Sequence, residues 1–104
     1  MSHKGVDVSV VRSESGVSAT VSGELDTATV ADAESALRPA VSGPGPVEVD
    51  LSGVTFCGSA GLSLLLELRN AAVAAGVEFV IARTSRAVDR LLDITGTAGV
   101  FTRR

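Results

Sequence analysis

Ser59 is the residue of this chain whose setting could support chemistry. It lies in the segment Cys57-Gly58-Ser59-Ala60-Gly61, after a run of alternating apolar residues and before a leucine-rich helical pattern. Its small neighbours leave the hydroxyl uncovered, and a helix start offers free N–H groups and the positive end of the helix dipole, which tolerate an added phosphate. Phosphorylation there would add about −2 of charge to a nearly flat surface. The alternative is a plain N-cap, in which the hydroxyl accepts a backbone N–H.

The residues that catalysis would need are missing. The segment 57–61 resembles a G-x-S-x-G nucleophile elbow, but Cys57 takes its first position and no histidine follows. The one histidine, His3, lies at the chain start, where it is no plausible base for Ser59. One His and one distant Cys do not make a metal site, and the glycines match no phosphate-binding loop. We therefore expect no enzymatic activity, no metal and no cofactor, and we interpret Cys57 as a small buried apolar residue.

Composition indicates a small cytoplasmic domain. The 104 residues allow one domain, and a hydrophobic content of 45% excludes disorder. A single cysteine fits a reducing compartment. A net charge of −3, with three aromatic residues and no dense basic cluster, argues against nucleic acid. The apolar stretch 60–77 contains Glu67, Arg69 and Asn70, so we expect no membrane insertion. Residues 79–104 hold five arginines against two aspartates, which we interpret as a solvated basic helix and tail.

The first half of the chain predicts two strands and a helix. Valine alternation predicts strands over 6–10 and 17–21, joined by a polar turn at 13–16. From Val30 to Val41 the apolar residues recur at helical spacing, with Asp26 or Thr27 as the cap and Pro39 limiting the last turn. Glu24 and Asp26 would lie at the end of the second strand, where they are candidates for contact with a basic partner.

The second half predicts strands over 47–51 and 77–81 and two further helices. A turn at Ser52-Gly53 and a short extended piece over 54–57 lead into a helix that starts at Ser59 and stops at Gly76. Its inward face would hold Leu62, Leu65, Leu66, Arg69, Ala72 and Val73, and Leu64 and Leu68 would widen this face, so that the helix is buried on more than one side. The last helix would run from Ser85 to Gly96 and point Val88, Leu91, Leu92 and Thr95 inward, with 100–101 as a short strand or a tucked tail.

This order, β-β-α-β-α-β-α, predicts a single α/β domain. Strands separated by a helix should pair in parallel, which gives a mixed sheet of four to five strands with helices mainly on one face. We expect a disordered N-terminus over residues 1–5 and the folded domain over 6–104.

Several of these segments together resemble the STAS domain, in its form as a free-standing bacterial anti-sigma factor antagonist. The resemblance rests on Gly-Glu-Leu-Asp at 23–26, Val-Asp-Leu-Ser-Gly-Val-Thr-Phe at 49–56, Ser-Ala-Gly-Leu at 59–62, Ala-Gly-Val at 75–77 and Leu-Leu-Asp-Ile-Thr-Gly at 91–96. It spans nearly the whole chain, from Val6 to Phe101.

The resemblance implies a partner-switching role in transcription and stress response. Such proteins bind an anti-sigma factor, a serine kinase with a histidine-kinase-like ATPase fold, and so release the sigma factor. The kinase phosphorylates a serine at the start of the second helix, which corresponds to Ser59, and a serine phosphatase resets the switch. The family's acidic loop residue corresponds to Asp26. The expected contact surface comprises Leu25, Asp26, Thr27, Gly58, Ser59, Ala60, Gly61 and Leu62.

One residue departs from the family pattern, because Gly58 stands where the motif usually has Asp. The loss of that acid removes a charge beside the acceptor serine. The chain could therefore bind its partner constitutively, or it could be the substrate of a divergent kinase. Two other functions remain as alternatives. One is a STAS subunit of another assembly, such as a lipid-transport complex or a stress-signalling scaffold, and the other is a module that senses a small ligand.

Overall fold

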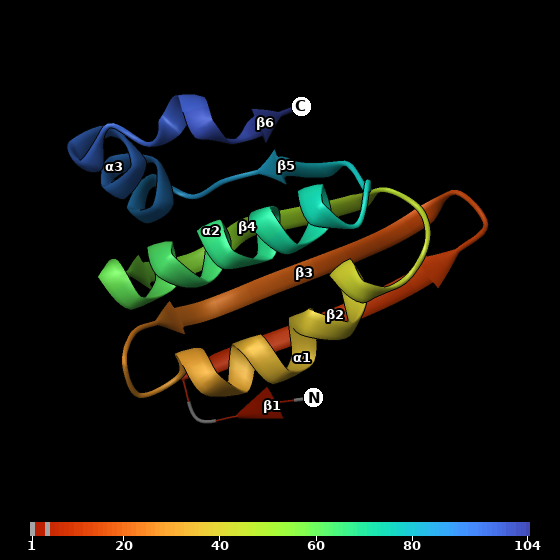
Figure 1. The fold of residues 1–104 in the computed structure, drawn as a ribbon. Coiled ribbons are helices and arrows are strands. Elements are labelled where there is room, and N and C mark those ends of the chain that lie inside the picture. The colour runs from red at the N-terminus through yellow and green to blue at the C-terminus, as the bar shows by residue number, and fades with distance from the viewer. Residues whose placement is uncertain (1, 4) are drawn as a thin grey trace.

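Six strands in chain order form the sheet that carries the rest of the molecule (Figure 1). The structure, a computed structural model, describes residues 2–3 and 5–104. The strands are β1 (Ser2–His3), β2 (Val6–Ser13), β3 (Gly16–Leu25), β4 (Val47–Cys57), β5 (Phe79–Arg83) and β6 (Thr102–Arg103). The helices are α1 (Val30–Ser42), α2 (Ser59–Ala74) and α3 (Arg86–Thr95), followed by the 3₁₀ turn η1 (Ala98–Val100).

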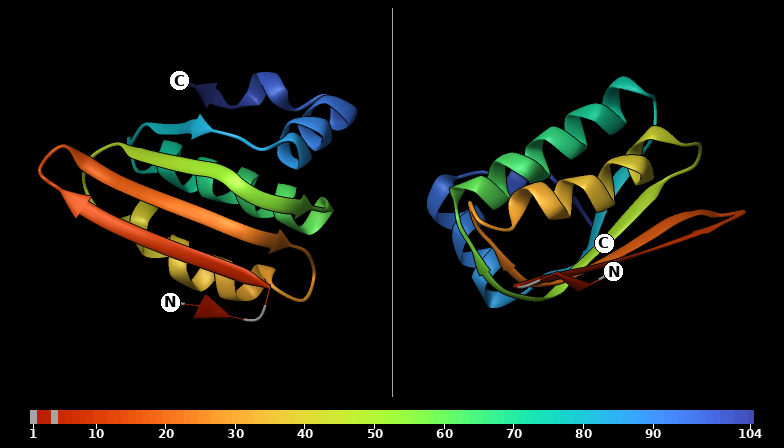
Figure 2. Two further views of the ribbon diagram at one scale, coloured as in Figure 1. Left: turned by 180° about the vertical axis from the view of Figure 1, so that it is seen from behind. Right: turned by 90° about the horizontal axis from the view of Figure 1, so that it is seen from below.

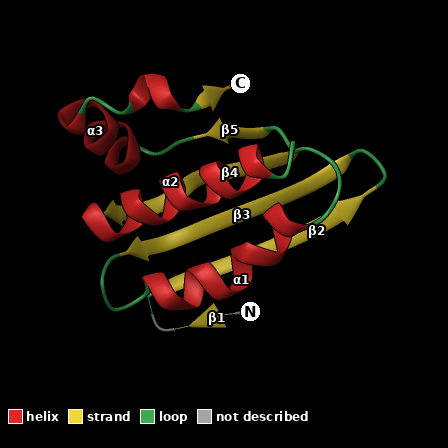
Figure 3. Ribbon diagram, in the orientation of Figure 1, coloured by secondary structure: helices red, strands yellow, loops and turns green. Residues whose placement is uncertain are grey.

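The mixed α/β architecture expected from the element order is confirmed. β2 and β3 form an antiparallel hairpin, whereas β3, β4 and β5 pair in parallel through the crossovers that contain α1 and α2. α1 and α2 lie together on one face of the sheet (Figure 2), and α3 is set apart beside β4 and β5 (Figures 1 and 3). In the described part of the chain, no helix is both long and apolar enough to cross a membrane.

Two very short strands extend the sheet at its outer edges. β6 pairs in parallel with β5, while Phe101 just before it is buried, so the chain end combines a tucked aromatic with a strand. At the other edge, β1 pairs with β2 inside the segment expected to be disordered. That expectation also concerns Met1 and Lys4, which lie outside the described residues.

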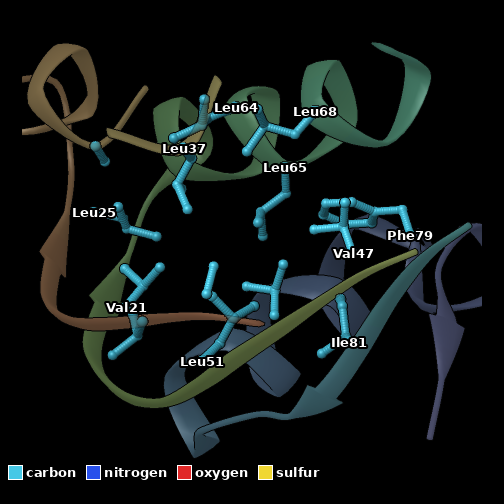
Figure 4. Packing of buried hydrophobic residues seen from close by; sticks show 14 of the residues in the cluster. Val21, Leu25, Leu37, Val47, Leu51, Leu64, Leu65, Leu68, Phe79 and Ile81 are labelled. Carbon is cyan, nitrogen blue, oxygen red and sulfur yellow. The ribbon is translucent and has the colours of Figure 1, made fainter. Parts of the chain in front are cut away.

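The core lies between the sheet and the pair α1 and α2. Leu65 of α2 points toward the strands and Leu64 lies beside Leu37 of α1, and all belong to one buried cluster with Leu68, Leu51 and Ile81 (Figure 4). The buried residues of α2 are Gly61, Leu62, Leu64, Leu65, Leu68 and Ala72.

The predicted inward faces of two helices are partly wrong. Val73 is 58% exposed, because the face that meets the sheet is centred on Leu65 and Leu68 and so turns Val73 toward solvent. Thr95 of α3 is also exposed, and its hydroxyl donates to the carbonyl of Leu91 at 2.7 Å. Thr95 is the last residue of α3 and lies beyond the part of the helix that packs against the sheet through Val88 and Leu92.

The predicted turn at Ser52-Gly53 is wrong, since β4 runs unbroken from Val47 to Cys57. A register shift against β3 occurs at this point, and the Oδ1 atom of Asp50 accepts a hydrogen bond from the Ser52 N–H at 2.8 Å. A Cβ atom at Gly53 would lie 2.7 Å from that of Ser22, so the glycine permits the close approach of the two strands. The irregularity lets β4 continue to the start of α2 instead of ending at 51.

The two ends of α3 agree with the sequence, whereas the end of α1 at Pro39 does not. Ser85 caps α3 by accepting the N–H of Val88 at 3.2 Å, and Gly96 ends it with a left-handed φ of 71°. α1 continues past Pro39 to Ser42, although a shortened last turn was expected. The guanidinium of Arg12 donates to the carbonyl of Pro39 at 3.3 Å, which satisfies one of the helix's terminal acceptors.

The buried face of α2 gives the first prediction. Leu65→Ala should lower the free energy of unfolding by about 2–5 kcal/mol, the range for a truncated core leucine. Val73→Ala on the same helix should change it by less than about 0.5 kcal/mol, because its side chain is exposed. Urea unfolding of both variants would test this, and equal losses would contradict the assignment of the face.

Candidate functional site

The parallel pairing of β3 and β4 brings together the two segments expected to form the contact surface. Leu25 and Cys57 are register partners at the ends of these strands, and the Gly58 N–H donates to the Leu25 carbonyl at 3.0 Å. Parallel strands end at the same edge of a sheet, so residues 25–27 and 58–62 lie side by side there. Ligand and partner sites in α/β proteins commonly form at this edge.

Ser59 presents a free hydroxyl at the start of α2. Gly58 is the N-cap residue, and Ser59 is the first residue of the helix, so the N-cap interpretation of Ser59 is wrong by one position. Ser59 is exposed, and among the described residues none hydrogen-bonds its hydroxyl. The first helical bond runs from the Leu62 N–H to the Gly58 carbonyl at 3.1 Å. The N–H groups of residues 59–61 therefore precede the ladder of helical bonds.

Gly61 sets the distance between α2 and the ends of the strands. A Cβ atom at this position would lie 2.8 Å from the Cys57 sulfur and 2.9 Å from the Cβ atom of Leu25. Leu25 is 1% exposed and Leu62 is also buried, so both support the surface from below. The absence of a side chain at Gly61 thus holds Ser59 close to the β3 loop.

Asp26 shapes that loop through its side chain. Its Oδ1 atom accepts the N–H groups of Ala28 at 2.9 Å and Thr29 at 3.1 Å. The N-cap of α1 is Thr29, so the predicted caps Asp26 and Thr27 lie too early, although Asp26 does stabilise the turn before the helix. Thr27 itself is exposed on the loop.

Thr29 is a structural residue of the site that the sequence reasoning missed. It is buried, its hydroxyl donates to the Glu24 carbonyl at 2.6 Å, and the Asp26 N–H donates to the same hydroxyl at 3.1 Å. An Asp followed three residues later by Thr, ahead of a helical pattern, is the signal that could have indicated it.

Cys57 packs beneath the site. Its side chain is buried, and this burial raises the pKa of the thiol, so the thiol stays protonated near neutral pH. Within the part of the chain that the structure describes, no three His, Cys, Asp or Glu residues lie together as metal ligands.

Phe56 is an exposed aromatic residue beside the loop, and the sequence reasoning did not single it out as a surface residue. It is 50% exposed, and a Cβ atom at Gly58 would lie 3.3 Å from its Cε2 atom. Inward residues of β4 occur at 47, 49, 51, 54 and 57, so the strand's irregularities change which residues face the core. Strict alternation from Val47, Val49 and Leu51 also places Phe56 outward, whereas the irregularities turn Val54 inward.

One protein family matches nearly the whole chain. The family described as Mlab, STAS domain matches residues 8–102. The chain belongs to the STAS domain family. Comparison with curated proteins gives no match in sequence.

Solved structures with the same fold include several anti-sigma factor antagonists. One of them, from Mycobacterium paratuberculosis, has 25% sequence identity to this STAS domain. The match covers 98% of this chain and 87% of the other, and the two structures superpose with a TM-score of 0.80. SpoIIAA in its unphosphorylated form is 17% identical over 94% of this chain and 88% of its own, with a TM-score of 0.75. The phosphorylated form of SpoIIAA, a Bacillus cell fate determinant, is 16% identical over 94% and 91%, with a TM-score of 0.70.

The close contact at Gly61 gives the second prediction. Gly61→Ala should lower the free energy of unfolding by about 1–3 kcal/mol, because the added methyl group overlaps Leu25 and Cys57. Gly99→Ala is the matched control, since a Cβ atom there meets nothing within 4 Å, and its effect should stay within about 0.5 kcal/mol. Thermal unfolding of the two variants would test this, and a neutral Gly61→Ala would show that α2 is not held by this contact.

Proposed function

We propose that this STAS domain is an anti-sigma factor antagonist, a non-catalytic cytoplasmic switch that binds an anti-sigma factor and so releases a sigma factor. The observation that carries the proposal is the exposed Ser59 hydroxyl, without a hydrogen-bond partner among the described residues, at the first position of α2. The fold shared with antagonists of known structure supports it. The contact surface comprises the exposed parts of residues 25–27 and 58–62, with Leu25 and Leu62 as buried supports.

Phosphorylation of Ser59 is the proposed off-switch. The anti-sigma factor acts as a serine kinase: the Ser59 oxygen attacks the γ-phosphorus of ATP, a base of the kinase takes the hydroxyl proton, and the bond from the γ-phosphorus to the bridging oxygen breaks so that ADP leaves. The product phosphate lies near the free N–H groups of residues 59–61 and the positive end of the α2 dipole, so the fold tolerates it. A serine phosphatase removes the phosphate by hydrolysis and restores binding.

Added charge explains why the phosphorylated form would leave its partner. Phosphate brings about −2 of charge to a surface that already carries Glu24 and Asp26 on the neighbouring strand end. Docking of the partner would have to remove water from this phosphate beside two carboxylates, which weakens binding without any change in the core.

The Ser59 variants test this switch. With the purified anti-sigma factor and ATP analogue, Ser59→Asp should raise the Kd at least about tenfold, because the added charge must lose its water beside Glu24 and Asp26, and Ser59→Ala should bind like the unchanged chain. With ATP, Ser59→Ala should take up no phosphate, as measured by intact mass. Because no hydrogen bond is lost, Ser59→Ala should alter the free energy of unfolding by less than about 0.5 kcal/mol.

Two outcomes would contradict the switch. Equal affinity for all three chains would remove Ser59 from the mechanism and leave a constitutive binder. Retention of a transporter ATPase from the source cell, in place of an anti-sigma factor, would favour the alternative of a STAS subunit in another assembly.

Gly58→Asp tests the departure from the family motif. The backbone at Gly58 has φ −96°, which any residue adopts, and the half-exposed Phe56 ring can yield the few tenths of an ångström that a Cβ atom needs. We expect Gly58→Asp to raise the initial rate of Ser59 phosphorylation about 100-fold, the lower end of what a positioned acid or base group contributes. Gly58→Asn, of equal size without charge, is the control and should not. An unchanged rate in both variants would indicate a kinase that does not read this position.

A further inference from the structure

An apolar groove opens beside the Ser59 loop, between the end of β4 and α3. It has a volume of about 310 Å³ and is lined by Phe56, Cys57, Ala87, Arg90, Leu91 and Ile94. Phe56 is 50% exposed and Ile94 is 70% exposed, so large apolar side chains from two elements face solvent at one place. Adjacent exposed apolar groups of this kind are typical of an interaction surface.

Arg90 gives the groove a basic margin. Its guanidinium makes no ion pair with any described residue, and it lines both this groove and the hollow next to it on α3. Asp89 does not neutralise it, because its Oδ1 atom is engaged by Arg103 at 3.1 Å and by the Thr84 hydroxyl at 2.7 Å. With Asp89 paired with Arg103, the carboxylate of Asp93 is the remaining acid beside the guanidinium groups of Arg86 and Arg90. This part of α3 therefore carries a net positive charge.

Glu24 lies on the opposite side of Phe56. The two residues are register partners on β3 and β4, so their side chains stand next to each other on the same face of the sheet. Glu24 is exposed and makes no ion pair within the described chain. Along this surface, the Glu24 carboxylate is followed by the Phe56 ring, then by the apolar groove, and finally by the Arg90 guanidinium.

We propose that this groove docks a segment of the anti-sigma factor that inserts an apolar side chain between Phe56 and Ile94 and presents a carboxylate to Arg90. The inference rests on the proposed function, since the partner is the same protein. Buried aromatic and arginine side chains commonly supply most of the binding energy at an interface. Phe56 would be the anchor, and Arg90 would set the orientation of the segment.

Continuity with the Ser59 loop favours this occupant. The Phe56 ring lies against Gly58, next to the position that phosphorylation would change. A segment seated on Phe56 would meet any phosphate at Ser59, so docking and release would be coupled through adjacent contacts.

The experiment compares groove variants with controls on α2 in binding to the purified anti-sigma factor. Phe56→Ala should raise the Kd at least about tenfold, as expected for an anchor residue. Arg90→Glu should slow association, with an effect that shrinks as the salt concentration rises. Val73→Ala and Arg69→Glu should change the Kd less than about twofold, since they lie some 15–20 Å along α2 from Ser59. Urea unfolding would verify that each variant is folded.

The outcomes separate the two proposals. If Ser59→Asp abolishes binding while Phe56→Ala and Arg90→Glu bind like the unchanged chain, the groove assignment is overturned and the proposed function stands. If the unchanged chain binds no anti-sigma factor, both are overturned. If sedimentation shows a dimer of the chain that Phe56→Ala dissociates, the groove belongs to a second copy and the docking proposal is overturned.

Discussion

The parallel pairing of the ends of β3 and β4 is the constraint on which the site depends. A hydrogen bond from the Gly58 N–H to the Leu25 carbonyl joins the loop before α2 to the strand before α1. Gly61 then allows the first turn of α2 to lie against Leu25 and Cys57. Without these contacts the serine would still begin a helix, but it would not lie beside the acidic loop.

The same arrangement separates what holds the fold from what a partner can reach. Leu25, Leu62 and Cys57 are buried at the base of the site, whereas Ser59, Thr27 and Phe56 are exposed above them. A charge added to Ser59 would therefore not enter the core. This separation is what a reversible surface switch requires, because binding can change while the free energy of unfolding stays nearly constant.

Phe56 links the proposed switch to the groove at α3. Its outward position agrees with the alternation that Val47, Val49 and Leu51 begin, whereas the irregular spacing further along β4 turns Val54 inward. A regular strand would present a different set of side chains at its end. The irregularity at Gly53 thus changes the orientation of residues 53–55, while Phe56 faces outward as it would in a regular strand.

Local patterns in the sequence were sufficient for most of the fold, because they depend on neighbours in the chain. Valine alternation predicted the hairpin, helical spacing predicted the three helices, and Ser85 and Gly96 were recognisable as helix ends. The motif around Ser59 indicated both the family and the residue at the centre of the proposed switch.

Tertiary structure decided the features that depend on contacts between distant segments. The bulge at Ser52-Gly53 looked like a turn, because the same residues suit both and only pairing with β3 distinguishes them. The exposure of Val73 depended on how α2 is rotated against the sheet, and the cap at Gly58 on where β4 ends. The groove between Phe56 and α3 joins residues more than thirty positions apart, so no local pattern could have predicted it.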